Sequence, residues 1–122
     1  MNVSINYKDK SISFHDNPVK EFCYDIFNGA IKMKFCNYYD INLKCLVDKE
    51  CNFIISNWEK VKTSVYKKDS DEILEKIENN IGILVEIFEI DFKDKTLIMT
   101  AEKIDGKIIT FYFENPIIEI LF

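Results

Sequence analysis

FCYDIFNGAIKMKF, residues 22–35, decides the fold because it reads as a single β-hairpin. Asn28-Gly29 is typical of a two-residue turn in which both central residues have positive φ. With Phe27 opposite Ala30, the ladder would also place Asp25 opposite Lys32 as a favourable cross-strand pair. Strict alternation then puts the large apolar side chains on one face, namely Phe22, Tyr24, Ile26, Ile31, Met33 and Phe35. The hairpin therefore predicts one wall of a β core.

Strand patterns continue on both sides of this hairpin. Alternating or β-branched runs predict further strands over 11–14, 41–47, 53–55, 83–92, 96–104, 107–113 and 117–122. A turn is expected over 37–40 and a three-residue loop over 93–95. Asp105-Gly106 predicts a second two-residue turn of the same type as the first.

One segment departs from the strand pattern. Asp69 can cap a helix whose first turn is acidic, and Ile73, Leu74 and Ile77 follow at helical spacing. These features predict a short helix over 70–79. The expected fold class is therefore mainly β (α+β), a curved antiparallel meander or half-barrel sheet with one short helix. Residues 1–122 are expected to form a single globular domain.

Charge is distributed unevenly along the chain. Residues 1–68 carry 11 lysines and 8 acidic residues, and residues 69–122 carry 5 lysines and 13 acidic residues, so the net charge of −5 combines +3 and −8. An acidic surface favours basic protein partners. Arginine is absent, and with it the guanidinium group that recognises phosphate or guanine through two hydrogen bonds. We therefore expect no nucleic-acid partner.

The four cysteines contain no CxxC pair, and the only histidine is His15. Metal ligands would have to come from distant positions, so neither a metal nor another cofactor is expected. The four thiols are expected to be reduced and mostly buried. No apolar run reaches the ~18–20 residues that span a bilayer, and the first residues lack the apolar region of a secretory signal. These features predict a cytoplasmic protein without a membrane partner.

The candidate binding surface lies on the second group of strands. A two-residue turn at Asp105-Gly106 would place five apolar side chains on the core face, namely Phe88, Ile90, Ile98, Phe111 and Phe113. The opposite face would carry Glu89, Asp91, Leu97, Met99, Tyr112 and Glu114. An acid-rich face that also contains tyrosine and methionine has the composition of a binding surface.

The same register places Glu86 opposite Glu102, where like charges repel. Three interpretations remain open: the loop register is wrong by one, the acids lie at a solvated rim, or the pair binds a partner's lysines or shares a proton. The candidate partner-binding residues are Glu86, Glu89, Asp91, Glu102, Tyr112 and Glu114. No catalytic motif accompanies them, so no catalytic residue is expected.

His15 and Trp58 are the other side chains considered for function. A general base needs a positioned nucleophile or water, which the sequence around His15 does not supply. His15-Asp16 is therefore expected to be structural, in a turn that continues through Asn17-Pro18. Trp58 is expected either to fill the core beneath a loop or to anchor an interface.

Four short motifs are spread over most of the chain. They are FHDNPV (14–19), IISNWE (54–59) followed by Lys62, Ser64 and Tyr66, NIGI (80–83) and FENP (113–116). Together they resemble small immunity proteins of bacterial polymorphic toxin and contact-dependent inhibition systems. The resemblance implies a mainly antiparallel β fold and a protein that binds and blocks one cognate toxin. It carries over no binding residue, because the toxin-contacting residues vary among such proteins.

The expected function is that of a non-enzymatic immunity protein, whose acidic surface occludes the active site of a basic toxin domain such as a nuclease. Two other functions stay open. One is a non-catalytic small-ligand-binding or adaptor β domain, and the other is a hydrolase that uses Glu86 and Glu102. A homodimer through an apolar edge at the last strand, which ends at Phe122, is also open.

Overall fold

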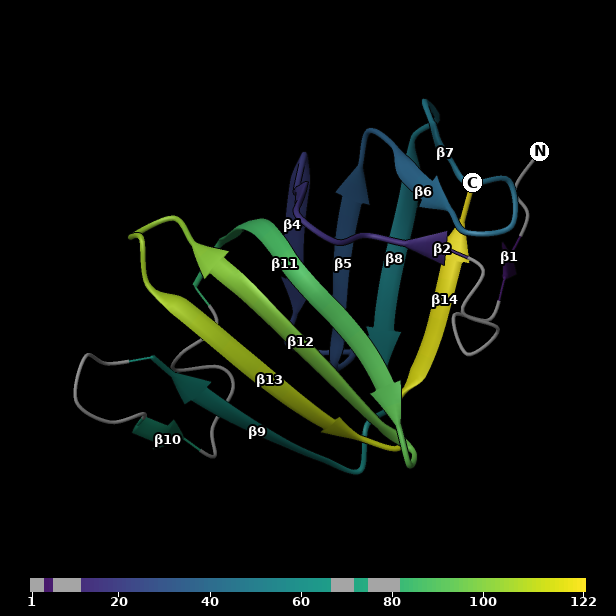
Figure 1. Ribbon diagram of the computed structural model, residues 1–122. Helices are drawn as coiled ribbons and strands as arrows, with labels where there is room; N and C mark the ends of the chain where they lie inside the picture. Colours follow the sequence, from purple (N-terminus) through teal and green to yellow (C-terminus); the bar gives the residue numbers. More distant parts are fainter. Residues whose placement is uncertain (1–3, 6–11, 67–71, 75–81) are drawn as a thin grey trace.

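The computed structural model describes residues 4–5, 12–66, 72–74 and 82–122. Within these residues every regular element is a β-strand, and every strand pair is antiparallel. Two sheets pack face to face with obliquely crossing strands, and a third small sheet lies beside the C-terminal strand (Figure 1). The predicted mainly β, antiparallel fold is confirmed, although the sheets stay open and do not close into a barrel.

The first sheet has five strands in the order β1-β14-β8-β5-β4. Their bounds are β1 Ser4–Ile5, β14 Ile117–Leu121, β8 Cys51–Ser56, β5 Ala30–Phe35 and β4 Glu21–Asp25. The final strand β14 lies between β1 and β8, so it is an interior strand. Within the described residues, strand β1 covers β14 at Ile120 and Leu121 only, and the homodimer through this strand stays a prediction.

The second sheet has six strands in the order β10-β9-β13-β12-β11-β3, and the third has the order β2-β6-β7. The bounds in the second sheet are β10 Glu72–Leu74, β9 Lys60–Val65, β13 Ile108–Glu114, β12 Thr96–Lys103, β11 Leu84–Lys93 and β3 Asn17–Pro18. Those in the third are β2 Ile12–Ser13, β6 Tyr38–Asp40 and β7 Cys45–Val47. Residues 41–44 form the turn between β6 and β7, so the turn predicted over 37–40 is wrong.

One continuous core fills the space between the two large sheets. Alternate residues of β5, β8, β12 and β13 point into it and are fully buried, including Ile31, Met33, Phe35, Phe53, Ile55, Leu97, Met99, Phe111 and Phe113. Phe14 stacks on Phe35 with ring centroids 4.5 Å apart and meets Phe53 edge-on at 5.4 Å. The phenylalanines that could have lined an apolar ligand cavity therefore pack against one another.

The β4–β5 hairpin keeps its predicted faces but not its predicted register. Asp25 pairs with Ala30 rather than Lys32, so the loop has four residues, 26–29, instead of two. The Asp25 carboxylate explains the wider loop, since it accepts hydrogen bonds from the Asn28 backbone N–H (3.1 Å) and side-chain amide (2.7 Å). These bonds lower the pKa of Asp25. The register shift of two residues leaves each side chain of the paired strands on its predicted face.

The helix predicted over 70–79 is wrong where the structure describes it. Glu72–Leu74 is strand β10 and pairs with Val65–Thr63 of β9. The other residues of that segment lie outside the described residues. A short run with helical spacing has only a weak intrinsic preference, and pairing with a neighbouring strand edge overrides it.

The cysteines differ in exposure, and the expectation that they are mostly buried is wrong. Cys23, Cys36 and Cys45 are exposed, and only Cys51 is buried. Burial raises the pKa of the Cys51 thiol to about 12. The thiolate is the reactive form of cysteine. Cys51 is therefore unreactive for two reasons: reagents cannot reach its buried side chain, and very little of its thiol is ionised.

We predict that a thiol reagent at neutral pH labels three of the four cysteines rapidly in the native protein. Cys51 should react only after unfolding, because its side chain is 1% exposed and its thiol stays protonated. Mass spectrometry of the alkylated peptides measures each site separately. Labelling of Cys51 as fast as that of Cys45 would contradict this buried environment.

Candidate functional site

The candidate site is the outer face of the six-stranded sheet. In this sheet the pairing of β12 with β13 differs by one residue from the pairing that the sequence predicted. The β12–β13 loop has three residues, Ile104 to Gly106, and Gly106 has φ 87°. Leu97 and Met99 therefore pair with Phe113 and Phe111 and are fully buried. Both were predicted on the binding face, and Ile98 was predicted in the core. A one-residue slip in register exchanges the two faces of a strand, which explains all three errors.

All six candidate partner-binding residues nevertheless lie on this outer face. Glu89 and Asp91 are on β11, Glu102 is on β12, and Tyr112 and Glu114 are on β13, and each alternates with buried or partly buried neighbours. Glu86 is also on β11, beside the sheet edge formed by Pro18. The predicted site residues are thus brought together across three adjacent strands.

Glu86 and Glu102 are directly opposite one another, as the sequence predicted. The strand register that produces this pairing differs from the predicted register. The β11–β12 loop has two residues, Asp94 and Lys95, and an irregularity between Ile87 and Glu89 then shifts the ladder by one residue. This β-bulge lets Glu86 and Glu89 face outward although they are three positions apart. The first of the three interpretations, an incorrect pairing, is therefore excluded for these two acids.

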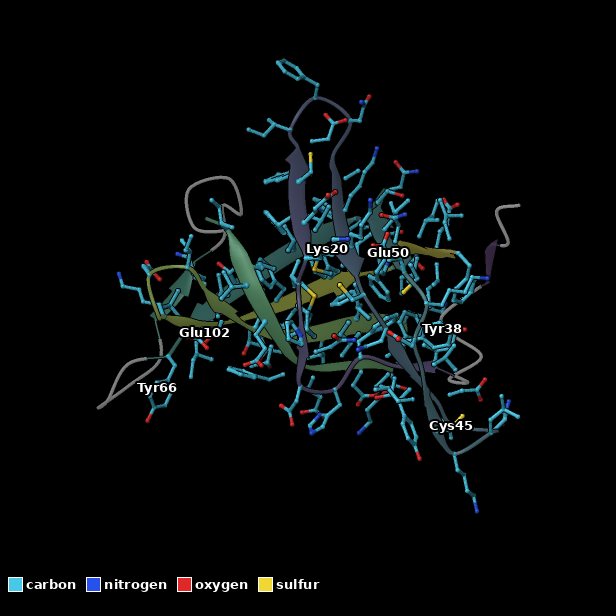
Figure 2. The ribbon with its side chains drawn as sticks, turned by 90° about the horizontal axis from the view of Figure 1, so that it is seen from above. Lys20, Tyr38, Cys45, Glu50, Tyr66 and Glu102 are labelled. Atoms are coloured by element: carbon cyan, nitrogen blue, oxygen red, sulfur yellow. The ribbon has the colours of Figure 1, made fainter. Side chains whose placement is uncertain are left out.

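The charges on this face fall into two zones. Lys60 and Lys62 of β9 lie opposite Glu114 and Tyr112, whereas the β11 and β12 side carries Glu86, Glu89, Asp91 and Glu102, with Lys93 at the end of β11. The ion pairs formed within the described residues lie elsewhere, for example between Lys20 and Glu50 (Figure 2). The four acids of β11 and β12 have no such partner among the described residues. This acidic strip is a concentrated negative charge that faces solvent.

Between the two zones the face is neutral and partly apolar. Tyr112 is 38% exposed and lies opposite Ile98 on β12. The hydroxyls of Thr100 and Thr110 form a cross-strand hydrogen bond of 3.1 Å. On the lysine side of Tyr112 lies a concavity of about 460 Å³, lined by Lys60, Lys62, Thr63, Ser64, Thr96, Tyr112 and Glu114. A charged surface with a central tyrosine and a concavity is suited to contact with another molecule.

The lysine side of this face was missed by the sequence prediction because β9 was not recognised as a strand. A signal was present: Val61, Thr63 and Val65 alternate with polar residues over Lys60–Val65. Three alternating β-branched residues favour a half-buried strand. Recognition of that pattern would have placed Lys60 and Lys62 on the solvent face of a strand, and the pairing of β9 with β13 then puts them on the same face as Tyr112.

His15 and Trp58 occupy structural positions. The His15 Nε2 atom lies 3.2 Å from the Asp16 carboxylate, and both side chains are about two-thirds exposed at 66% and 65%. The His15 backbone N–H donates to the Ser13 hydroxyl at 3.3 Å, as in a turn. Trp58 packs on Phe113 with ring centroids 5.1 Å apart. These contacts favour the structural interpretation of both residues.

The described residues contain no group of three or more His, Cys, Asp or Glu side chains placed to hold a metal ion. They also contain no helix with the length and apolar character needed to cross a membrane. The chain matches no protein-family model, and no curated protein or solved structure shows significant similarity to it.

The opposed acids lead to a stability prediction. Replacing Glu102 with glutamine should stabilise the fold by ~0.3–1 kcal/mol, because like charges directly opposite in a ladder are destabilising by about that amount. Urea denaturation at low ionic strength measures the change. The gain should shrink in high salt, which screens exposed charges. A loss of stability at both salt concentrations would show that Glu102 has a stabilising partner.

Proposed function

We propose that this protein binds a basic protein partner through the outer face of the six-stranded sheet. The observation that carries the proposal is the acidic strip of Glu86, Glu89, Asp91 and Glu102, in which Glu86 and Glu102 face one another. Opposed acids repel in the free protein, and a cationic partner would relieve that repulsion on binding. Tyr112, beside this strip, is a residue type enriched at the centres of interfaces.

With the resemblance to immunity proteins, the proposed partner is a cognate bacterial toxin domain. We propose that the protein meets this toxin in the cytoplasm and neutralises it without catalysis. If the toxin is a nuclease, its groove for RNA or DNA is basic, and an acidic strip can occupy that groove by mimicking the nucleic acid's charge. Electrostatic steering would then speed the encounter at low salt.

Co-expression tests this proposal. If a large protein is encoded immediately upstream of this chain, its C-terminal domain of about 100–200 residues is the probe, and the absence of such a protein would count against the proposal. Expression of that domain alone should stop growth, and co-expression of this protein should restore it. A toxin domain that still kills cells containing abundant folded protein would overturn the proposal.

One observation favours a second candidate, a small-ligand-binding domain. The concavity of about 460 Å³ beside Tyr112 falls within the size range of small-molecule sites. Its lining combines two lysines and one glutamate with hydroxyl side chains and Tyr112, and its surface is more apolar than polar, so a ligand that has both an apolar part and an anionic group would suit it best. Binding of such a ligand that is lost on replacing Lys62 with alanine would support this candidate.

A further inference from the structure

One end of the outer face of the six-stranded sheet is apolar. Four large side chains lie there on the adjacent strands β9, β13, β12 and β11 or directly beside them, namely Tyr66, Ile108, Ile104 and Ile83. Their exposed fractions are 62%, 37%, 68% and 51%. The neighbouring residues Val65, Ile109 and Leu84 are buried, so by alternation the four side chains belong to the outer face. We call these four residues the apolar end.

Backbone pairing brings the members of the apolar end together. The Ile104 N–H donates to the Ile83 carbonyl at 2.8 Å, and the Tyr66 N–H donates to the Ile108 carbonyl at 3.0 Å. Ile108 lies opposite Glu102, which precedes Ile104 by two positions and shares its face. Figure 2 shows Glu102 and Tyr66 at the same end of the protein. Single exposed apolar residues are common, whereas a group of this kind marks an interaction site.

The charge that borders the apolar end on this face is negative. Glu86 and Glu102 lie directly opposite one another, and neither forms an ion pair within the described part of the chain. By alternation Lys103 belongs to the opposite face. Its side chain is 14% exposed, and its Nζ atom lies 3.9 Å from the Asp105 carboxylate. The apolar end is therefore complementary to an apolar surface that carries positive charge at its border.

We propose that the apolar end is the water-excluding centre of the interface with the basic protein partner. The partner covers it with an apolar side chain that is bordered by lysine or arginine. Interfaces combine an apolar centre with a charged rim, and the residues at the centre supply most of the binding energy. The aliphatic stem of a lysine can pack on Ile104 or Ile108 while its ammonium group reaches Glu102. This inference rests on the proposed function for the identity of the partner.

Charge argues against a second copy of this chain as the occupant. Two copies that meet through their apolar ends would bring Glu86 and Glu102 of one copy close to the same acids of the other. Like charges repel strongly when water is excluded around them. A basic partner instead neutralises the two acids while it covers the isoleucines.

A matched pair of isoleucine variants tests the inference. Ile104→Ser should weaken binding of the toxin domain by about tenfold or more, as expected for a residue at the centre of an interface. Ile26→Ser is the control and should leave affinity unchanged. Both isoleucines lie in hairpin loops and are similarly exposed, at 68% and 64%, so the fold should tolerate either substitution. Calorimetric titration measures both variants, and equal effects would overturn the inference.

Salt dependence distinguishes the apolar contact from the acidic strip. Salt screens exposed charges but does not remove the gain from burying apolar surface. The loss of affinity caused by Ile104→Ser should therefore be the same at low and high salt, whereas the loss caused by Glu102→Gln should shrink at high salt. A loss from Ile104→Ser that disappears at high salt would contradict an apolar contact.

Hydrogen exchange is a second measurement that needs no substitution. With saturating toxin domain, amide exchange in the loop 104–106 should slow by about tenfold or more, while exchange in the loop 26–29 stays unchanged. Tight binding without this protection, and without loss of affinity in Ile104→Ser, would overturn the inference and leave the proposed function intact. Absence of binding by the unmodified protein would overturn the proposed function, and the inference would fall with it.

Discussion

Replacing Phe53 with alanine is expected to destabilise the protein by ~3–5 kcal/mol, the range for truncating a fully buried phenylalanine. Phe53 is 0% exposed on β8 and its ring meets Phe14 edge-on. The cavity would lie in the layer between the two sheets, where both would lose contacts. Domains of this size are stable by only ~5–15 kcal/mol. The melting temperature should therefore fall by about 10–20 °C.

Phe27→Ala is the matched control for this experiment. It removes the same atoms from a side chain that is 100% exposed, so stability should change by less than ~0.5 kcal/mol. Thermal unfolding followed by circular dichroism measures both variants. Equal shifts in the two would contradict the placement of Phe53 in a shared core.

The second large effect is expected for association with the toxin domain. Reversing two charges of the acidic strip, in the double variant Glu89→Lys and Asp91→Lys, should slow association by about 100-fold at low salt. Both residues are exposed on β11, so the fold should tolerate the change. Stopped-flow fluorescence of Trp58 or of a labelled toxin domain measures the rate.

A control variant with the same change in net charge shows whether the association rate depends on the acidic strip or on the net charge of the whole protein. Asp48→Lys with Glu119→Lys also adds four positive charge units, but these residues lie in the loop after β7 and on β14 of the first sheet. The control rate should stay close to that of the unmodified protein, because exposed charges more than ~10 Å apart are largely screened at ordinary salt. Equal slowing in both double variants would show that net charge, not the acidic strip, governs association.

Alternation predicted correctly which residues of a strand share a face, whereas the turn motifs did not predict the loop lengths that set the register between strands. The paired strands of the β4–β5 hairpin keep their predicted faces, but Ile26, predicted on the apolar face, lies in the four-residue loop with Asn28-Gly29 and is 64% exposed. Hydrogen bonds from Asn28 to the Asp25 carboxylate widen that loop. Asp25 is not part of the Asn28-Gly29 motif from which the turn was predicted. A register error of two residues leaves each side chain of the paired strands on the same face, so the predicted core residues of these strands are correct.

An error of one residue has the opposite effect. Asp105-Gly106 is preceded by Ile104 within a three-residue loop, and this single extra residue moved Leu97 and Met99 from the predicted binding face into the core. The two-residue turn at Asp94 and Lys95 was also missed. Both residues have positive φ, at 51° and 67°, without the usual glycine. The Lys95 carbonyl accepts a hydrogen bond from the Asn115 N–H at 2.8 Å, a tertiary contact that local sequence does not reveal.

The candidate site was predictable because it consists of strand positions that alternate with core residues. Glu89 and Asp91 lie outward since Ile90 and Phe92 pack on the core, and Tyr112 lies outward since Phe111 and Phe113 are buried. The bulge after Ile87 depends on pairing across the sheet, so the sequence could not locate it. The grouping of Tyr66, Ile83, Ile104 and Ile108 at one end of the sheet likewise follows from strand order, which a single sequence does not determine.

Calorimetric titration of this protein with the toxin domain, at low and at high salt, is the most direct test of the central claim that the acidic face binds a basic protein. We predict nanomolar affinity, with a free energy of binding of about −12 kcal/mol, and weaker binding at high salt. The double variant Glu89→Lys and Asp91→Lys should lose most of this salt dependence. Absence of binding, or tight binding that is insensitive both to salt and to this variant, would contradict the claim.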